Sequence, residues 1–194
     1  MAKKESTFLN MFLTLLIVTA ISSLAASAVY NLTKGPIAEV ARLKQQKAIE
    51  QVMPGFTSYN EFKVMPETGK DSLIFFKAFK GEEEIGVAIN SYTYVGYSGL
   101  IKIMVGFQPD GAIENVEVLV QKETPGLGTK MAEPKFKDQF VGKNLADFNN
   151  HEILVTKDGG VIDAITAATI TSRAFCDAVN RAYRALEENK KENK

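Results

Sequence analysis

The segment IKIMVGFQPDGAIENVEVLVQ, residues 101–121, decides the fold class of this chain. Apolar residues occupy alternate positions in 101–107 and again in 116–120, which is the period of a β-strand that buries one face. The sequence QPDG at 108–111 separates these runs, and its proline and glycine favour a tight turn. The segment therefore predicts an antiparallel β-hairpin.

Further β-structure is expected before this hairpin. Residues 73–79 and 85–94 are rich in the aromatic and β-branched side chains that are typical of strands. Residues 55–71 contain scattered glycine and proline and are expected to form a loop. Because strands joined by short turns pair antiparallel, we expect a largely antiparallel sheet.

The remainder of the domain is expected to be mostly helical. The sequence predicts a short helix within 130–142, a short strand at 153–155, and a final amphipathic helix that Ser172 caps and that runs to about Glu188. Together these elements predict the α+β class, with helices flanking the antiparallel sheet.

A long segment without charge precedes the domain. No charged residue occurs between Ser6 and Thr33, and residues 8–30 are predominantly apolar. As a helix they would measure roughly 34 Å, enough to cross the hydrocarbon core of a lipid bilayer. We expect residues 1–33 to form a single transmembrane anchor. A signal peptide cleaved after the small residues 26–28 is the alternative, and the flanking lysines do not decide the orientation.

The segment after the anchor links it to the domain. The sequence KGP at 34–36 is expected to end the membrane segment. Apolar residues then recur at helical spacing as far as Pro54, so an amphipathic helix and a linker are predicted over 34–71. The domain proper is expected over 72–188, and 189–194 would be a charged tail.

The composition excludes several kinds of site. Lys and Arg total 23 and Asp and Glu total 23, so the net charge gives no reason to expect a nucleic-acid partner. A single cysteine and a single histidine exclude an internal disulfide and a multi-Cys or multi-His zinc site. Cys176 is expected to be a small buried residue, and His151 a surface residue where the strand at 153–155 begins.

The sequence ETPGLG, residues 123–128, is the first candidate site. Its proline fixes one backbone angle and its glycines allow conformations closed to other residues, so the loop could bring main-chain N–H groups close to a ligand. A plain tight turn remains the alternative. The candidate binding residues are Glu123, Thr124, Gly126, Leu127 and Gly128.

The sequence DAITAATITS, residues 163–172, is the second candidate site. Its hydroxyl side chains come just before a helix, whose N-terminus offers free N–H groups and partial positive charge to a phosphate. A β-branched strand followed by a capped helix is the alternative. The candidate binding residues are Asp163, Thr166, Ala168, Thr169, Thr171 and Ser172.

Residues 163–169 resemble the flavinylation motif D-x-x-[S/T]-[G/A/S]-A-T of the FMN-binding domain family. Residues 123–128 resemble a second hallmark of its membrane-bound members, and the GYSG sequence at 96–99 resembles a weaker third one. Ala167 stands where many members have glycine. Many relatives also have a histidine near Gln121 or Lys122, which this chain lacks.

The resemblance implies covalent FMN, which a flavin transferase joins through its phosphate to Thr169. It implies phosphate contacts from Thr166, Thr171 and Ser172, and a flavin contact from Leu127. It also implies that Asp163 shapes the loop or is recognised by the transferase. No catalytic residue and no metal ligand is expected on this chain.

Among the membrane-bound members, the chain is similar to the G subunits of Rnf complexes, which are ion-pumping ferredoxin:NAD+ oxidoreductases. This similarity implies an electron-relay subunit that works with other membrane and redox subunits. It also implies a single-pass protein of the inner (plasma) membrane with its domain on the extracytoplasmic side. The alternatives are the C subunit of a sodium-pumping NADH:quinone reductase, a stand-alone membrane-anchored flavoprotein, and a binding module without flavin.

Overall fold

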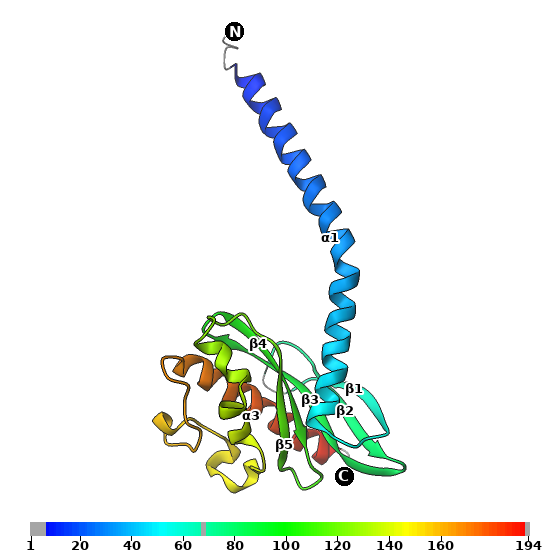
Figure 1. Ribbon diagram of the computed structural model, residues 1–194, viewed down its shortest axis with the longest axis vertical. Helices are drawn as coiled ribbons and strands as arrows, with labels where there is room; N and C mark the ends of the chain where they lie inside the picture. The colour runs from blue at the N-terminus through cyan, green and yellow to red at the C-terminus, as the bar shows by residue number, and fades with distance from the viewer. Residues whose placement is uncertain (1–6, 67–68, 193–194) are drawn as a thin grey trace. The chain divides into compact units, whose positions relative to one another are not determined.

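The computed structural model of the protein describes residues 7–66 and 69–192 (Figure 1). It contains two compact units, the first ending at Lys44 and the second beginning at Gln45. The first six residues of the predicted anchor and the last two of the predicted tail lie outside the described residues.

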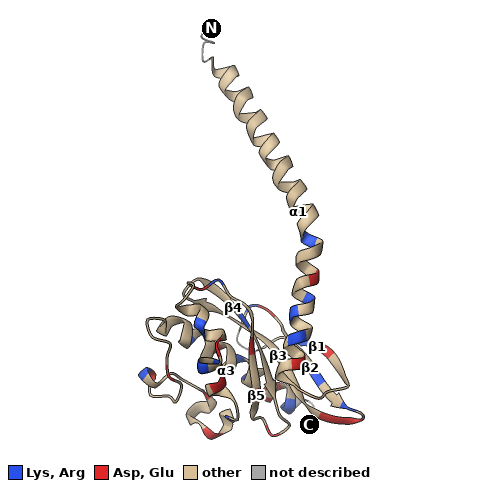
Figure 2. Ribbon diagram, viewed as in Figure 1, with Lys and Arg blue, Asp and Glu red and all other residues tan. Residues whose placement is uncertain are grey.

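The first long element is helix α1, Phe8–Val52. The chain stays helical through Pro36, although an interior proline removes one backbone hydrogen bond, so the helix predicted after residue 36 is continuous with the anchor helix. The first charged residue of the described helix is Lys34, and the ribbon of the preceding part of α1 is tan throughout in Figure 2. By length and composition this helix can cross a membrane, and none of its most apolar window is buried in the structure.

Five antiparallel strands form one sheet in the order β1-β2-β3-β4-β5, each beside the next in sequence. They are β1 (Ser58–Val64), β2 (Leu73–Lys80), β3 (Glu83–Gly96), β4 (Gly99–Phe107) and β5 (Ile113–Val120). The predicted hairpin is confirmed as β4 and β5, and its turn is closed by a 2.9 Å bond from the Gly111 N–H to the Gln108 carbonyl. Gly111 supplies the positive φ of 92° that the turn requires.

The prediction of a loop over 55–71 is wrong for part of that stretch, because 58–64 form the edge strand β1. Most of its side chains are exposed, so it lacks the apolar alternation that marks a half-buried strand. What holds it is pairing with β2, where Phe62 lies opposite Phe75 with ring centroids 5.2 Å apart.

The two faces of the sheet are covered by different helices of the second unit. Helix α3 (Thr169–Glu192) packs on the face that carries Phe75, within the larger buried cluster. Ile49 and Val52, at the end of α1, pack on the opposite face against Phe76. Successive residues of β2 therefore point into two separate cores, as the pleat of a strand requires.

The connection between β5 and α3 is built of short helical turns rather than long elements. The predicted helix within 130–142 is present only as fragments: η1 (Gly128–Ala132), α2 (Pro134–Lys137) and η2 (Asp138–Phe140). Three more turns follow as η3 (Leu145–Asp147), η4 (Asn149–His151) and η5 (Thr156–Asp158).

The predicted strand at 153–155 is wrong, since only one isolated bridge forms there, between Val155 and Ile162. The Asn180 side chain accepts from the Ile153 N–H at 2.9 Å and donates to its carbonyl at 3.0 Å. A helix side chain thus satisfies the backbone groups that a neighbouring strand would have paired. His151 is exposed, as expected, but it ends η4 instead of beginning a strand.

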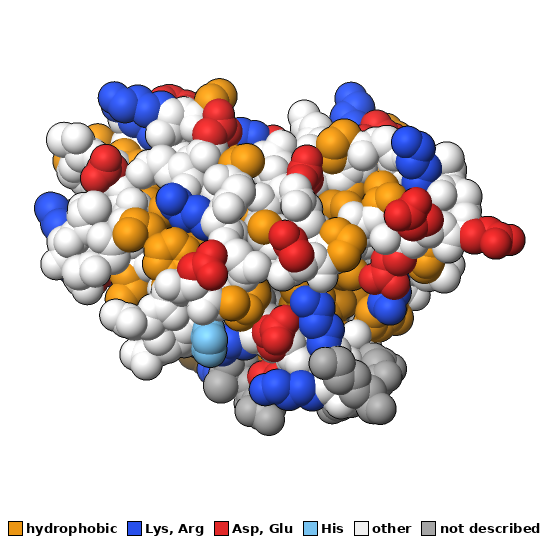
Figure 3. Space-filling model, turned by 90° about the horizontal axis from the view of Figure 1, so that it is seen from below, with side chains coloured by type: hydrophobic (Ala, Val, Ile, Leu, Met, Phe, Trp, Pro, Cys, Tyr) orange, Lys and Arg blue, Asp and Glu red, His pale blue; other side chains and the backbone are white. Residues whose placement is uncertain are grey.

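On the face shown in Figure 3, acidic and basic side chains are interspersed.

Candidate functional site

The two candidate segments meet at one cavity of about 520 Å³ in the second unit. The loop after β5 forms one wall and the start of α3 forms another. Tyr97, from the turn between β3 and β4, also lines the cavity, so all three glycine-rich or hydroxyl-rich segments converge here. The lining residues are Tyr97, Glu123, Thr124, Leu127, Gly128, Ala167, Ala168, Thr169, Ile170 and Thr171.

Glu123 joins these three segments to one another. Its side chain is 5% exposed, and each carboxylate oxygen accepts one hydrogen bond. The Ser98 N–H donates to Oε1 at 2.9 Å, and the Thr171 hydroxyl donates to Oε2 at 2.7 Å. Both oxygens of this buried carboxylate have partners, so Glu123 has a structural role. We call Glu123 with its two hydrogen bonds, to Ser98 and Thr171, the clasp.

Gly128 is needed here because there is no space for a side chain. A Cβ at this position would lie 2.7 Å from Glu123 Oε2 and 2.8 Å from Thr171 Oγ1, at the centre of the clasp. Gly126 is different, since it has open space and a φ of 75°. Of the two glycines, only Gly126 therefore uses the conformational freedom that the sequence analysis assigned to both.

The loop at 123–128 uses several of its own backbone donors. The Gly126 N–H donates to Thr129 Oγ1 at 3.0 Å, and the Leu127 N–H donates to the Thr124 carbonyl at 3.1 Å. These two N–H groups are therefore engaged within the loop. The loop offers the cavity the Leu127 side chain, which is 40% exposed and so has apolar surface to cover.

Helix α3 begins at Thr169, three residues before the predicted start. Ser172 is therefore not an N-cap, which is a correction to the sequence analysis. Its buried hydroxyl donates to the Ala168 carbonyl at 3.0 Å and accepts from the Ile165 N–H at 2.9 Å. It ties the first turn of the helix to the preceding loop, in which Ala167 has a φ of 61°. Such a φ is strained for a residue with a side chain, and strain of this kind is frequent at functional sites.

Thr169 stands at the N-terminus of a 24-residue helix and lines the cavity. The first N–H groups of a helix have no partner within it and carry partial positive charge. Lys157, from η5, lies beside this threonine, with its Nζ 3.4 Å from Thr169 Oγ1. A hydroxyl, helix amides and, 3.4 Å from that hydroxyl, an ammonium group are thus gathered at the start of α3.

An ion pair fastens η5 to α3. Arg173 donates to both carboxylate oxygens of Asp158, at 2.7 and 2.6 Å. These hydrogen bonds hold the pKa of the Asp158 carboxyl below its usual value. Because Arg173 is one helical turn beyond Thr169, the pair fixes the turn that carries Lys157 against the start of the helix.

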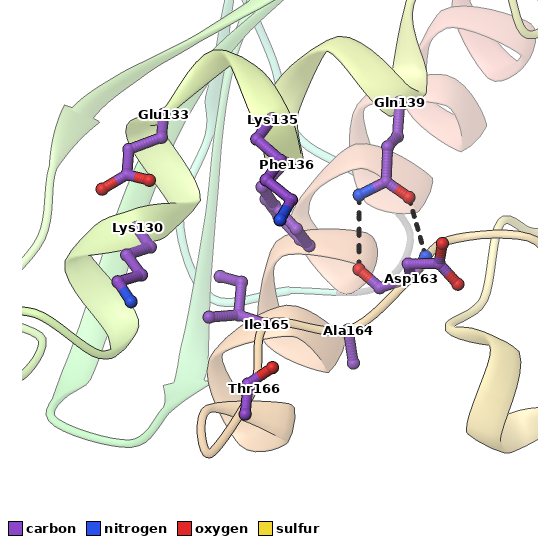
Figure 4. Close-up of a pocket in the computed structure, with 9 residues that line it drawn as sticks. All are labelled: Lys130, Glu133, Lys135, Phe136, Gln139, Asp163, Ala164, Ile165 and Thr166. Carbon is purple, nitrogen blue, oxygen red and sulfur yellow. Dashed lines mark hydrogen bonds between the residues drawn. The ribbon is translucent and has the colours of Figure 1, made fainter.

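A second cavity, of about 550 Å³, lies beside residues 163–166 (Figure 4). Asp163 and Thr166 line this second cavity and not the first. The Gln139 side chain accepts from the Asp163 N–H at 2.8 Å and donates to its carbonyl at 3.3 Å, as the dashed lines show. Gln139 therefore holds the backbone of the loop, while the Asp163 carboxylate points away from the Gln139 amide.

The structure brings together most of the predicted site residues at the first cavity. Those that line it are Glu123, Thr124, Leu127, Gly128, Ala168, Thr169 and Thr171. Gly126 and Ser172 shape its walls without lining it. Sequence reasoning missed Lys157 and Gln139, because no local pattern relates them to the two motifs. It also did not select Ile170, which lies inside the second segment and lines the cavity.

The first cavity fits a ligand with a flat apolar body and an anionic end. Its volume lies within the range of small-molecule sites, roughly 300–1,000 Å³. Tyr97, Leu127 and Ile170 supply exposed apolar surface, and Thr169 supplies a hydroxyl at the helix N-terminus. These are the features that a flavin ring and a phosphate group require.

Comparison with known proteins also indicates a flavin-binding family. The model of the family described as FMN-binding domain matches residues 96–184. The G subunit of the ion-translocating oxidoreductase complex of Escherichia coli K12 is 34% identical over 88% of this chain and 86% of its own length. The corresponding G subunit from Aliivibrio fischeri ES114 is 36% identical over 86% of each chain, and that from Methanosarcina acetivorans is 26% identical over 89% and 91%.

A solved structure is also similar. The protein in the crystal structure of Shewanella oneidensis NqrC is 23% identical in sequence to this chain, and the two structures superpose with a TM-score of 0.47. The similarity covers 69% of this chain and 66% of that one, so the chain spans just under two thirds of that protein.

Proposed function

Because the chain belongs to the family of G subunits of ion-translocating oxidoreductase complexes, we propose that it is an electron-relay subunit carrying covalent FMN on Thr169. One observation carries the proposal. The two motif segments, far apart in sequence, line a single cavity that includes the Thr169 hydroxyl. A phosphoester at Thr169 would place the phosphate at the helix N-terminus and leave the ring system beside Leu127 and Tyr97.

When bound, FMN supplies the redox chemistry through its isoalloxazine ring. The contribution of this chain is to hold and surround it. The clasp at Glu123 fixes the walls, Thr171 is committed to that clasp, and Ser172 orders the first turn of α3. The phosphate contacts expected from Thr171 and Ser172 would therefore come from the helix backbone rather than from their hydroxyls.

We further propose that α1 is a single-pass anchor in the plasma membrane. The anchor would hold this subunit in the same membrane as the other subunits of the complex. Its apolar, uncharged first part is the supporting observation. The domain would lie on the extracytoplasmic side, in line with the family resemblance. The electron partners would be the membrane and redox subunits of a ferredoxin:NAD+ oxidoreductase of the Rnf type, and a flavin transferase would attach the cofactor.

The direct test is the intact mass of the full chain, purified in detergent from cells with and without a flavin transferase. We expect the mass to rise by one FMN less one water, as a phosphoester to a hydroxyl requires, only with the transferase, and peptide mapping should locate the addition at Thr169. Thr169→Val, which is nearly isosteric, should abolish the addition and the in-gel flavin fluorescence. Thr169→Ser keeps a hydroxyl and should be labelled in part.

Thr156→Val is the matched control, because Thr156 is exposed and lies outside the motif segment, so labelling should stay intact. Flavin found on Thr166 or Thr171 would contradict the residue assignment. A wild-type chain that acquires no flavin at all would contradict the proposed function.

A further inference from the structure

Lys157 lies at the edge of the candidate site and has no acidic partner among the residues that the structure describes. Its Nζ lies 3.4 Å from Thr169 Oγ1, which is a long and weak contact to a neutral hydroxyl. Among the ion pairs of residues 7–66 and 69–192, none involves Lys157. The neighbouring carboxylate, Asp158, is already engaged by both donors of Arg173. The Lys157 ammonium is therefore free to pair with an anion.

The turn that carries Lys157 is firmly built. The Thr156 N–H donates to the Ile162 carbonyl at 2.8 Å, which closes the loop just before residues 163–172. Gly159 has a φ of 83°, and a Cβ at Gly160 would lie 2.1 Å from the Leu154 carbonyl oxygen. With the Asp158–Arg173 pair, these features fix the Lys157 backbone near the start of α3, so its position is a property of the fold.

The charge at the cavity indicates what this cation would bind. Of the described lining residues, only Glu123 is charged, and its carboxylate is negative and engaged in the clasp. An anion joined to Thr169 would therefore meet no full positive charge among the lining residues, and Lys157 lies just outside them. Helix amides supply only partial charge, roughly half an elementary charge for the whole terminus.

We propose that Lys157 is the counter-cation of the phosphodiester formed when FMN is joined to Thr169. This inference rests on the proposed function and adds a residue to its site. Lys157 acts as a positioning residue, because it holds the phosphate end of the cofactor and takes no part in electron transfer. In the protein without flavin the ammonium faces only the Thr169 hydroxyl, so its substitution should matter little there.

The test is a comparison of the flavin-free and flavin-bound full chain in detergent, for the wild type, Lys157→Gln and Lys157→Arg. The flavin content of each sample is determined from its intact mass. Thermal unfolding midpoints are then measured at low and at high salt. We expect attachment of FMN to raise the midpoint of the wild type more than that of Lys157→Gln, by about 2–4 °C for each kcal/mol of pairing. Lys157→Arg should show a rise close to that of the wild type, and high salt should reduce the rise in both of these proteins but not in Lys157→Gln.

Lys80→Gln is the matched control, since Lys80 is exposed and lines a different cavity. It should behave as the wild type. Loss of labelling in Lys157→Gln with labelling kept in Lys157→Arg would also support the proposal, because the charge would then be needed for attachment. Equal rises in the wild type and Lys157→Gln, with FMN mapped to Thr169 in both, would overturn it and leave the proposed function intact. A wild type without flavin would overturn both.

Discussion

The Thr171 hydroxyl donates a 2.7 Å hydrogen bond to Glu123 Oε2 across 48 positions of sequence. Both side chains are buried, at 1% and 5% exposure. The bond joins the loop after β5 to the first turn of α3, and the other oxygen of Glu123 holds Ser98. The walls of the cavity are therefore coupled through one carboxylate.

The first prediction concerns this bond. Thr171→Val keeps the shape but leaves a buried carboxylate oxygen without a donor, which should lower the free energy of unfolding by about 1–3 kcal/mol. Thr171→Ser restores a hydroxyl and should recover most of this loss. Urea unfolding of the flavin-free chain is the measurement. Thr166→Val, at an exposed threonine, is the control, and an equal effect of both valine variants would contradict the role of the clasp.

The second prediction concerns the flavin wall. Leu127 is 40% exposed, so Leu127→Ala should cost less than about 1 kcal/mol of stability in the flavin-free chain. In the flavin-bound chain it should shift the flavin absorption spectrum and midpoint potential, because it removes apolar surface next to the ring.

The comparison variant for this prediction is Gly126→Ala. It has room for a methyl group but forces a φ of 75° on alanine, so it should lower stability by about 1–2 kcal/mol. We expect its flavin spectrum to change less than that of Leu127→Ala. An unaltered spectrum and potential in Leu127→Ala would remove Leu127 from the cofactor site.

The third prediction concerns Ala167, whose φ is 61°. Glycine adopts this conformation freely, and Ala167→Gly relieves strain of about 1–2 kcal/mol at an entropic cost of about 0.4–1 kcal/mol. The flavin-free chain should therefore gain up to about 1.5 kcal/mol. Ala168→Gly, in the same loop but without this strain, should lose stability. A loss in both variants would mean that the positive φ carries no energetic cost.

The fourth prediction concerns the buried thiol of Cys176, which is 2% exposed. Burial, with a contribution from Asp158, raises the pKa of this thiol from 9.0 to about 12. Between about pH 9 and pH 12, the folded chain thus retains the thiol proton that the unfolded chain loses. Its contribution to stability is complete below about pH 9 and is lost as the pH rises through about 12.

Alkylation measures this directly. At pH 8.5 the thiol should resist iodoacetamide in the folded chain and react once denaturant unfolds it. The alkylation and unfolding curves should coincide. Rapid labelling of the native chain would show that the helix opens locally around Cys176.

The fifth prediction concerns topology. If α1 is a retained anchor, the mature chain should stay in the membrane fraction after a high-salt wash, with its N-terminal segment present by mass. A reporter fused after Lys194 should be active only outside the cytoplasm. A mature chain beginning at Val29 would identify a cleaved signal peptide instead.

Much of the fold was predictable because its signals are local. The β4–β5 hairpin follows from apolar alternation and a turn whose glycine needs a positive φ, and both can be recognised in a short window. Strand β1 was missed because an exposed edge strand carries little periodicity and depends on pairing with β2. The strand predicted at 153–155 failed because the Asn180 side chain, 27 positions away, takes its place as partner of Ile153.

The candidate site shows the same division. Thr169 and the loop at 123–128 follow from motif resemblance, and the structure brings both to one cavity. Ser172 was misplaced because the helix begins earlier than its best capping residue, and Asp163 lies at a neighbouring cavity. Lys157 and Gln139 act through contacts that span 12 and 24 positions, so no short pattern predicts them.

The order of the strands has a consequence for how the protein matures. Since each strand pairs with the next one along the chain, the sheet can assemble hairpin by hairpin as the polypeptide emerges. Helix α3 follows the sheet in the chain, and it supplies Thr169, Thr171 and Ser172. The cavity thus gains this wall only after all five strands have been synthesised, and a chain that stops before α3 would present a sheet but no place for a cofactor.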